Sequence, residues 1–164
     1  MASKNIDFGE LWERIKDHRT AMLTTVSNNG MIHSRPMMTQ EREADMDLWF
    51  VTSLNTEKVD EIKVNPKIGV LYYRDADNAY VSIAGTAEIN TDKDLIRSKW
   101  KEDWKIWFPE GPDQANMALI KVTPVEAEYW EPKGGKLTVM FEMARGYVTG
   151  DHPELNPPVE GKVK

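Results

Sequence analysis

The chain has 164 residues, contains no cysteine and has only three histidines, so two large classes of site chemistry are poorly supplied. Without thiols there can be no disulfide, no thiolate nucleophile and no thiolate metal ligand. His18, His33 and His152 are scattered along the sequence and match no metal-ligand spacing, so we expect no metal site. For His33, a strand histidine with a local hydrogen bond is favoured over a catalytic role.

Excess positive charge is also missing, as is any long apolar run. The formal net charge is −6, which repels a phosphate backbone, so we expect no nucleic-acid partner. No segment has the apolar length that a bilayer requires, and residues 1–18 have the pattern of a helix rather than of a signal peptide. We therefore expect no membrane association and a cytoplasmic location.

The common nucleotide and nucleophile motifs are absent as well. No G-x-x-x-x-G-K-[ST] or G-x-G-x-x-G sequence occurs, which argues against a P-loop and a Rossmann site. No serine lies in a nucleophile elbow. The catalytic residues therefore stay unknown, with His33 and Tyr72 as the only candidates for an acid or a base.

Short segments of β-rich, alternating sequence dominate what is present. Strands are expected over six ranges that pair as antiparallel hairpins, with short helices between them: 20–27, 31–39, 48–52, 67–73, 80–89 and 117–130. This pattern predicts a mainly β fold, a closed or split six-stranded barrel with flanking helices. Residues 1–150 are expected to form one domain, and 151–164 a flexible tail.

Three local features refine this expectation. Pro36 cannot donate to a strand ladder, so its strand should be an edge or should break there. Gly85 lies inside a strand pattern and predicts a bulge or a close backbone approach. Ile96, Trp100, Trp104 and Trp107 follow one another at spacings of four, four and three, which predicts one helix face. For the tryptophans, an interface is favoured over contact with a planar cofactor.

Residues 31–64 contain the best candidate for a binding site. Thr52 and Ser53 end a strand, and Thr56 and Lys58 begin the next helix. Hydroxyls, helix N–H groups and a lysine suit a phosphate, and Arg35 could reach it from the neighbouring strand. A capped surface helix accounts for the same residues, since Asn55 or Thr56 could cap a helix in any protein, and spacing alone favours that alternative.

Several segments together resemble the general stress protein 26 family, which belongs to the pyridoxamine 5'-phosphate oxidase-like, FMN-binding split barrels. They occur in the expected order and span nearly the whole chain: HSRPM, the Thr-Ser turn with its lysine, NP before a strand, and W-x-x-W-F-P-x-G. The resemblance implies a six-stranded antiparallel split barrel with FMN, or alternatively FAD, as cofactor. It also implies a homodimer with the flavin at the subunit interface.

The resemblance further assigns roles to individual residues. Arg35 matches an arginine near the flavin phosphate and ribityl chain. Thr52 and Ser53 match a strand-end pair that contacts the flavin, and Thr56 and Lys58 match its phosphate-binding turn. Four further positions are expected around the ring, the first three through their main chain and the last from the partner subunit: Pro36, Met37, Met38 and Trp107.

The chain also departs from the oxidase proper. Gln40 stands where a lysine is expected, Glu57 replaces an arginine, and Trp130 is not followed by the substrate-binding W-R-x-x-P pattern. The resemblance therefore implies flavin binding without implying oxidation of vitamin B6 phosphates. The expected function is that of an FMN-dependent oxidoreductase acting on an unidentified small molecule. One alternative is a non-catalytic flavin-binding stress protein for storage, sensing or scavenging, and another is a split barrel holding haem or a deazaflavin.

Overall fold

The structure is a computed structural model that describes residues 8–38, 40, 47–76, 78–130, 135–150 and 159–161. Its seven strands form a single antiparallel sheet in the order β2-β1-β4-β5-β6-β3, with β7 paired to β6. The strands are β1 (Thr20–Val26), β2 (Ile32–Met38), β3 (Leu48–Ser53), β4 (Lys67–Arg74), β5 (Ala79–Asn90), β6 (Met117–Trp130) and β7 (Val159–Gly161). The helices are α1 (Phe8–Ile15), α2 (Glu57–Val64), α3 (Lys93–Lys99) and α4 (Gly135–Thr149), and a 3₁₀ helix, η1, spans Glu102–Ile106.

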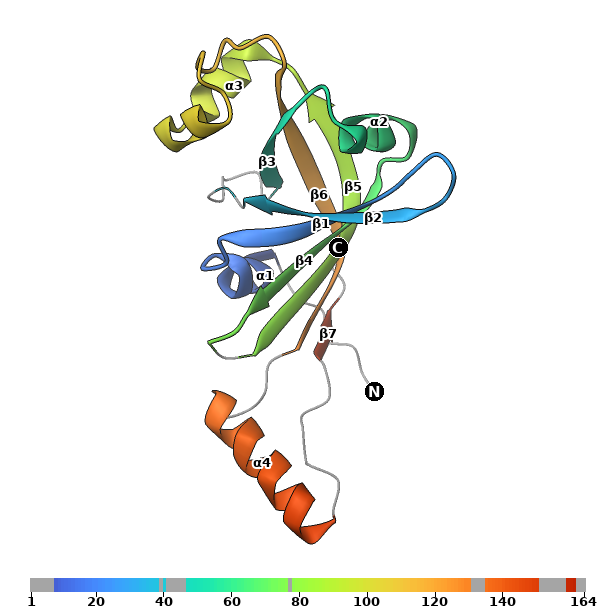
Figure 1. The fold of residues 1–164 in the computed structure, drawn as a ribbon, viewed down its shortest axis with the longest axis vertical. Coiled ribbons are helices and arrows are strands. Elements are labelled where there is room, and N and C mark those ends of the chain that lie inside the picture. Colours follow the sequence, from blue (N-terminus) through green and yellow to red (C-terminus); the bar gives the residue numbers. More distant parts are fainter. Residues whose placement is uncertain are drawn as a thin grey trace.

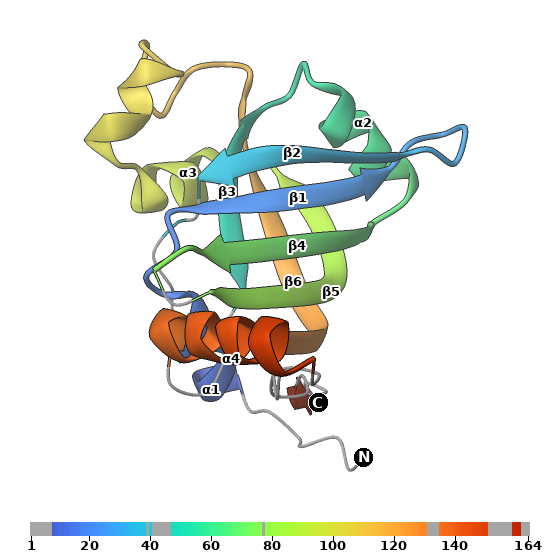
Figure 2. The same cartoon turned by 60° about the horizontal axis from the view of Figure 1, so that its bottom comes forward.

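The sheet is strongly curled, so that its two edge strands, β2 and β3, approach each other at the open side (Figure 1). Figure 2 shows β2, β1, β4 and β5 as successive strands of one wall, with β6 and β3 crossing behind them. This half-barrel of six long strands confirms the predicted mainly β split-barrel fold, to which β7 adds a short strand. β7 lies within residues 151–164, for which the sequence predicts a flexible tail.

Strand periodicity explains which side of the sheet is packed. Along β5 the inward residues alternate with outward ones, and Val81 and Ile83 are almost fully buried. Leu23 on β1 and Val70 on β4 are completely buried beside them. Each such side chain stabilises the fold by about 1.5–3 kcal/mol through removal of apolar surface from water. Leu11 of α1 and Ile62 of α2 join the same core cluster.

Gly85 forms the predicted irregularity between β5 and β6. The strand register shifts between Ala84 and Gly85, opposite Pro124. A Cβ atom built on Gly85 would lie 2.5 Å from the carbonyl oxygen of Thr123, closer than real Cβ atoms come. Only glycine therefore allows the two backbones this approach. Pro36 likewise lies on an edge strand, because β2 pairs with β1 alone among the described strands.

The prediction of one tryptophan-bearing helix is wrong. α3 begins after Asp92, whose side chain accepts hydrogen bonds from the first turn, and it ends at Lys99. Trp100 then adopts φ −56° and ψ 135°, outside helical values, and η1 follows. Trp104 is buried and packs edge-to-face on Trp100, with 5.8 Å between ring centroids. Two short elements in succession thus reproduce the spacing of one longer helix, but they leave Trp107 half-exposed.

The last helix ends at a glycine. α4 stops before Gly150, which has φ +75° and donates its N–H to the Gly146 carbonyl over 2.9 Å. In the parts of the chain that the structure describes, no helix combines the length and the apolar character needed to cross a membrane.

Candidate functional site

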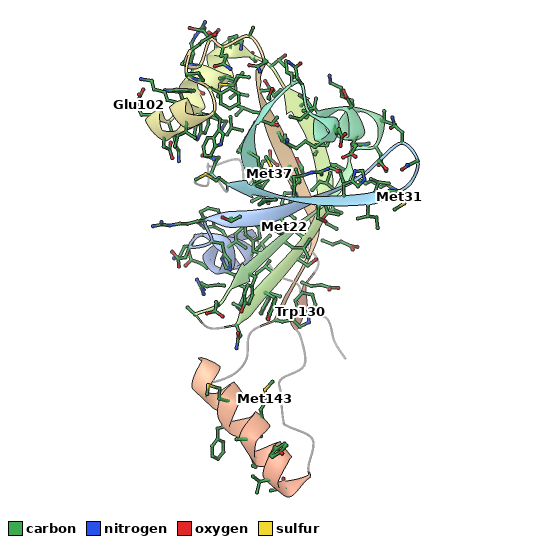
Figure 3. All side chains as sticks on the ribbon, in the orientation of Figure 1. Met22, Met31, Met37, Glu102, Trp130 and Met143 are labelled. Atoms are coloured by element: carbon green, nitrogen blue, oxygen red, sulfur yellow. The ribbon has the colours of Figure 1, made fainter. Side chains whose placement is uncertain are left out.

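A cavity of about 400 Å³ opens at the seam of the half-barrel, where β2 approaches β3 and the first turn of α2. This volume falls in the range of small-molecule sites. Its lining is apolar on one side and carries hydroxyl, amide and ammonium groups on the other: Pro36, Met37, Met38, Val51, Thr52, Ser53, Lys58, Trp107, Phe108 and Asn116. In Figure 3, Met37 marks the part of β2 that faces this seam.

Most of the residues that the resemblance assigns to a flavin come together here. Seven of the nine line the cavity: Pro36, Met37, Met38, Thr52, Ser53, Lys58 and Trp107. Arg35 and Thr56 do not line it. Trp107 reaches the cavity of its own chain, because η1 folds back from α3 toward the end of β2. Phe108 and Asn116 are additional lining residues that the sequence analysis did not select.

The turn between β3 and α2 leaves helix donors without a side-chain cap. Thr56 is the N-cap residue, yet its hydroxyl donates to the Ser53 carbonyl over 2.9 Å and caps no helix N–H. The Ser53 hydroxyl accepts a hydrogen bond of 3.0 Å from the Asn116 side-chain amide. The alternative of an ordinary side-chain-capped helix is therefore not realised, and the positive end of α2 is available to an anion.

Lys58 places a cation beside these helix donors. Burial, together with the nearby Arg35 guanidinium, lowers the pKa of Lys58, while the Glu61 carboxylate acts in the opposite direction. With the described residues Lys58 makes no hydrogen bond or ion pair. A half-buried ammonium without a direct partner gains most from a bound anion, because that anion replaces the water that burial has removed.

A buried carboxylate behind the cavity organises the neighbouring side chains. Glu61 accepts a hydrogen bond of 2.5 Å from the Thr25 hydroxyl and pairs with the Arg35 guanidinium at 3.0 Å. Its other oxygen lies 2.6 Å from Nδ1 of His33. Burial opposes ionisation of Glu61, but the hydrogen bonds from Thr25, His33 and Arg35 outweigh it and lower the pKa.

This cluster changes the expected role of three residues. Arg35 is held by Glu61 and by the Thr25 hydroxyl, rather than clamped over the cavity. His33 lies in the same cluster outside the cavity lining. Tyr72 packs in the core against His18, with 5.5 Å between the ring centroids, and lines a different cavity. Neither candidate acid or base therefore lines the seam cavity.

Sequence reasoning missed Glu61 because it assigned only the apolar residues of α2 to the interior. A usable signal was present in the alternation of β2. His33 and Arg35 share one face of that strand, and Thr25 pairs with His33 across the hairpin. Thr25 is buried and Arg35 is largely buried, so this polar face requires a partner, and the short α2 helix offers a carboxylate.

The chain that forms the seam cavity matches a known protein family. Residues 7–154 match the family described as pyridoxamine 5'-phosphate oxidase like. The chain belongs to this family. General stress protein 26 of Bacillus subtilis is 31% identical over 129 residues, which cover 77% of this chain and 89% of that protein.

Solved structures of related proteins share the fold of this family member. The crystal structure of General Stress Protein 26 from Bacillus anthracis strain Sterne is 32% identical, with a TM-score of 0.65, covering 74% of this chain and 92% of the other. The general stress FMN/FAD binding protein from Xanthomonas citri is 24% identical, with a TM-score of 0.64 and coverage of 74% and 86%. At that identity, the second likeness shows the fold alone.

The structure shows where Gln40 and Glu57, two residues at which this chain departs from the oxidase proper, are located. The side-chain oxygen of Gln40 accepts a hydrogen bond of 3.2 Å from the Trp104 indole, and its amide donates to the Met38 carbonyl over 3.2 Å. Gln40 thus ties η1 to the end of β2. Glu57, in the first turn of α2, is exposed. Neither residue lines the cavity.

Proposed function

We propose that the protein binds a flavin in the seam cavity, FMN in preference to FAD. The observation that carries this proposal is the half-buried ammonium of Lys58, which pairs with none of the described residues, beside the first turn of α2, which has no side-chain cap. Together they offer a positive charge and free N–H donors, which fit a terminal phosphate. The Xanthomonas citri relative is described as an FMN/FAD binding protein, which supports a flavin as the ligand without separating FMN from FAD.

The remaining lining fits the other parts of this molecule. Met37 and Met38 on β2 and Trp107 after η1 supply an apolar, polarisable surface for a flat ring. The Thr52 and Ser53 hydroxyls, at the end of β3, line the same cavity and suit a hydroxylated linker. Trp107, being half-exposed, would shield the ring from water.

We further propose that the bound flavin serves an oxidoreductase reaction on a small molecule. A bound flavin supplies reversible electron and hydride transfer, while the protein supplies orientation, charge and a shielded pocket. Lys58 would place positive charge near the phosphate, and the walls formed by Met38 and Trp107 would limit access to one side of the ring.

A second candidate function, flavin binding without catalysis, is favoured by one observation. Lys58 is the single ionisable side chain among the described residues that line the cavity. A reaction that needs a general acid or base would have to take its proton from substrate, solvent or a second chain. Storage, sensing or scavenging by bound flavin has no such requirement.

Two measurements separate these outcomes. The visible absorption spectrum of purified protein, with mass analysis of what is released on denaturation, identifies the cofactor; protein that takes up neither FMN nor FAD on titration would contradict both candidates. Stopped-flow reduction by NADH and NADPH, followed by a screen of electron acceptors, tests catalysis. Rapid turnover with an acceptor supports the oxidoreductase, and stable flavin without turnover supports the binding protein.

A further inference from the structure

A chain of side-chain amides leads from the loop before β6 to the seam cavity. The backbone N–H of Glu110 donates to Oε1 of Gln114 over 3.2 Å. The side-chain nitrogen of Gln114 donates to Oδ1 of Asn116 over 2.9 Å, and that of Asn116 donates to the Ser53 hydroxyl over 3.0 Å. Asn116 and Ser53 line the cavity, whereas Gln114 does not. These hydrogen bonds therefore connect a loop residue outside the cavity with a hydroxyl inside it.

The direction of this chain of hydrogen bonds is fixed at its outer end. A backbone N–H can only donate, so the atom of Gln114 that faces Glu110 has to be its carbonyl oxygen. The NH₂ group of Gln114 then faces Asn116, whose carbonyl oxygen accepts, and the NH₂ group of Asn116 is left to face Ser53. One backbone group thus determines the orientation of both amides, and Ser53 has to accept at the inner end.

The Ser53 hydroxyl has only its proton left for another partner. A hydroxyl offers one donor and two acceptor sites. The Asn116 amide occupies one acceptor site, and the backbone N–H of Asn55 approaches the same oxygen at 3.4 Å. Among the residues that the structure describes, none accepts the Ser53 proton. Because Ser53 lines the cavity, it presents a hydrogen-bond donor to a molecule bound there.

The two amides are held in place without help from a ligand. The backbone carbonyl of Gln114 accepts a hydrogen bond of 2.7 Å from the ammonium of Lys93, at the start of α3. The backbone carbonyl of Asn116 accepts one of 2.7 Å from the N–H of Leu54, the residue after Ser53. The loop is therefore anchored both to α3 and to the turn after β3. A donor that is oriented in advance loses little conformational freedom when a ligand binds.

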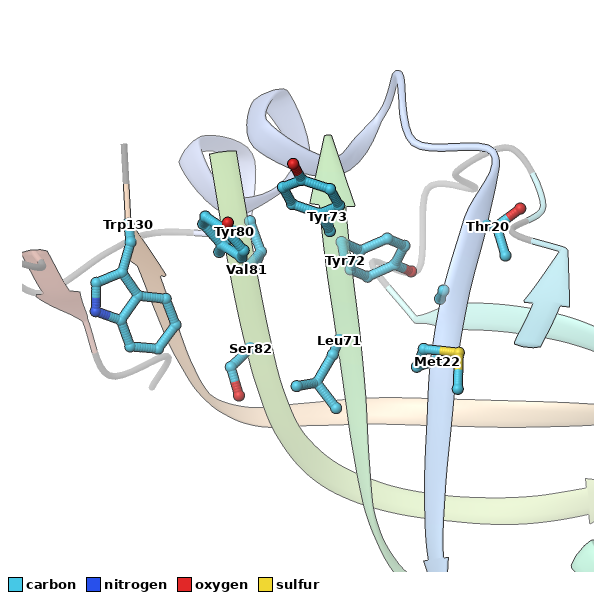
Figure 4. A pocket seen from close by; sticks show the side chains of 10 residues that line it. Thr20, Met22, Leu71, Tyr72, Tyr73, Tyr80, Val81, Ser82 and Trp130 are labelled. Carbon is cyan, nitrogen blue, oxygen red and sulfur yellow. The ribbon is translucent and has the colours of Figure 1, made fainter. Parts of the chain in front are cut away.

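A second cavity, which lies over β1, β4 and β5, offers no comparable donor. Figure 4 shows Thr20 and Ser82 in the lining of this cavity, which has a volume of about 570 Å³. Neither side chain makes a hydrogen bond with the described residues, so each hydroxyl can rotate and can either donate or accept. The fixed orientation is therefore particular to Ser53 and does not follow from a serine lining a cavity.

We propose that Gln114 and Asn116 are positioning residues, which fix the Ser53 hydroxyl as a hydrogen-bond donor toward the ligand. Because this inference rests on the proposed flavin site, the partner of Ser53 is an acceptor atom of the ribityl chain or of the ring, which FMN and riboflavin share. A molecule that turned an N–H group toward Ser53 would meet a second donor and would lose a hydrogen bond there. The loop before β6 thus contributes to ligand selection from outside the cavity.

The substitution Gln114→Glu should reverse the chain of hydrogen bonds without touching the cavity. A carboxylate still accepts from Glu110 but cannot donate, so the Asn116 amide should turn its NH₂ group to the carboxylate and its oxygen to Ser53. The Ser53 proton then bonds to Asn116 and is withdrawn from the ligand. We expect riboflavin to bind about twofold to tenfold more weakly, as in Ser53→Ala, which is the effect of one neutral hydrogen bond. Riboflavin is the probe because it has no phosphate that the introduced charge could repel.

The double variant separates positioning from a structural role. Once Ser53→Ala has removed the hydroxyl, Gln114→Glu should weaken riboflavin binding no further, because no hydroxyl is left to orient. A merely structural role of Gln114 would give the same loss in both backgrounds. Ala115→Asp adds the same charge at an exposed neighbouring position and should bind riboflavin as the wild type does. Urea unfolding checks that each variant is folded under the conditions of the titration.

The outcomes distinguish this inference from the flavin site itself. Wild-type affinity of Gln114→Glu for riboflavin, or additive losses in the double variant, would overturn the positioning role and leave the flavin site intact. Wild-type protein that binds neither riboflavin nor FMN would contradict the flavin site. The orientation is also tested without a ligand, by the NMR signals of the Asn116 side-chain NH₂ group. Ser53→Ala should shift these signals and speed their exchange with water, and unchanged signals would overturn the assigned orientation.

Discussion

Replacing the buried Glu61 by glutamine should destabilise the fold, because three donors converge on its carboxylate. Thr25, His33 and Arg35 all lie within hydrogen-bond distance of it, and the side chains of Glu61 and Arg35 are only 7% and 21% exposed. Glutamine keeps the size but removes the charge and turns an NH₂ group toward the donors. A hydrogen bond to a charged group is worth about 1.5–3 kcal/mol, and Arg35 keeps some solvent, so we expect a loss of about 2–3 kcal/mol at pH 7.

The loss should depend on pH in a defined direction. Burial of Glu61 works against its charged form, but the hydrogen bonds from Thr25, His33 and Arg35 outweigh it, so the folded-state pKa lies below the ordinary value. The folded state therefore binds this proton less readily than the unfolded state does. Its stabilisation is complete above the unfolded-state pKa and is lost as the pH falls through the folded-state pKa. The difference between wild type and Glu61→Gln should accordingly shrink in acid.

Urea unfolding followed by tryptophan fluorescence measures this difference at neutral pH and at a series of acidic pH values. Glu57→Gln is the matched control, because Glu57 is an exposed carboxylate in the first turn of the same helix and should contribute no more than about 1 kcal/mol. The reasoning would be refuted by a Glu61→Gln loss no larger than that of the control, or by a loss that stays constant into acid.

Two further substitutions test the cavity wall and the bulge. Trp107→Ala should weaken flavin binding about threefold to tenfold in an equilibrium titration, since an aromatic pair is worth about 0.5–1.5 kcal/mol. The control Ile106→Ala, at an exposed site, should leave the affinity unchanged. Equal flavin affinities of the two variants would show that Trp107 is not part of the site. Gly85→Ala should lower the unfolding free energy by about 1–3 kcal/mol, because its Cβ would strike the Thr123 carbonyl. Gly69→Ala, whose Cβ would meet an ordinary contact of 3.6 Å, is the control, and a similar loss in both would contradict a special role for Gly85.

The barrel could be predicted from the sequence because β1, β4 and β5 alternate clearly between buried and exposed residues. In β5, Val81 and Ile83 point inward between exposed or half-exposed neighbours, and such a period of two has one interpretation when a face must be buried. Pro36 and Gly85 were equally informative, since proline lacks the N–H that an interior strand needs and glycine allows the close backbone approach of a bulge. Single-residue rules of this kind do not require knowledge of the rest of the fold.

The tryptophan segment could not be assigned in the same way. Spacings of four, four and three suit one helix, and nothing local to Trp100 marks a break. What decides the break is tertiary: Trp104 is buried and hydrogen-bonded to Gln40, which lies 64 positions earlier in the chain. Packing of this kind overrides a local helical pattern.

Most residues that line the cavity could be predicted from the sequence, but the pairing of the charged side chains around it could not. Thr52, Ser53 and Lys58 stand out in sequence because hydroxyls and a lysine meet at a helix start. Arg35 also stands out, yet its partner is Glu61 of α2 rather than the cavity, and only the folded chain brings those two side chains together. The contact between Arg35 and Glu61 therefore decides that Lys58, rather than Arg35, is the cation available to a bound anion.

The most direct test of the proposed flavin site compares FMN with riboflavin, which lacks the phosphate, in wild type and Lys58→Met. The phosphate should add about 1.5–3 kcal/mol in the wild type, which is roughly a tenfold to hundredfold tighter dissociation constant for FMN. Lys58→Met should remove most of this difference and leave riboflavin binding unchanged, while Lys63→Met, an exposed lysine in the last turn of α2, should behave as wild type. Equal affinities for FMN and riboflavin in the wild type, or a preference for FMN that survives Lys58→Met, would contradict a phosphate-binding site at Lys58.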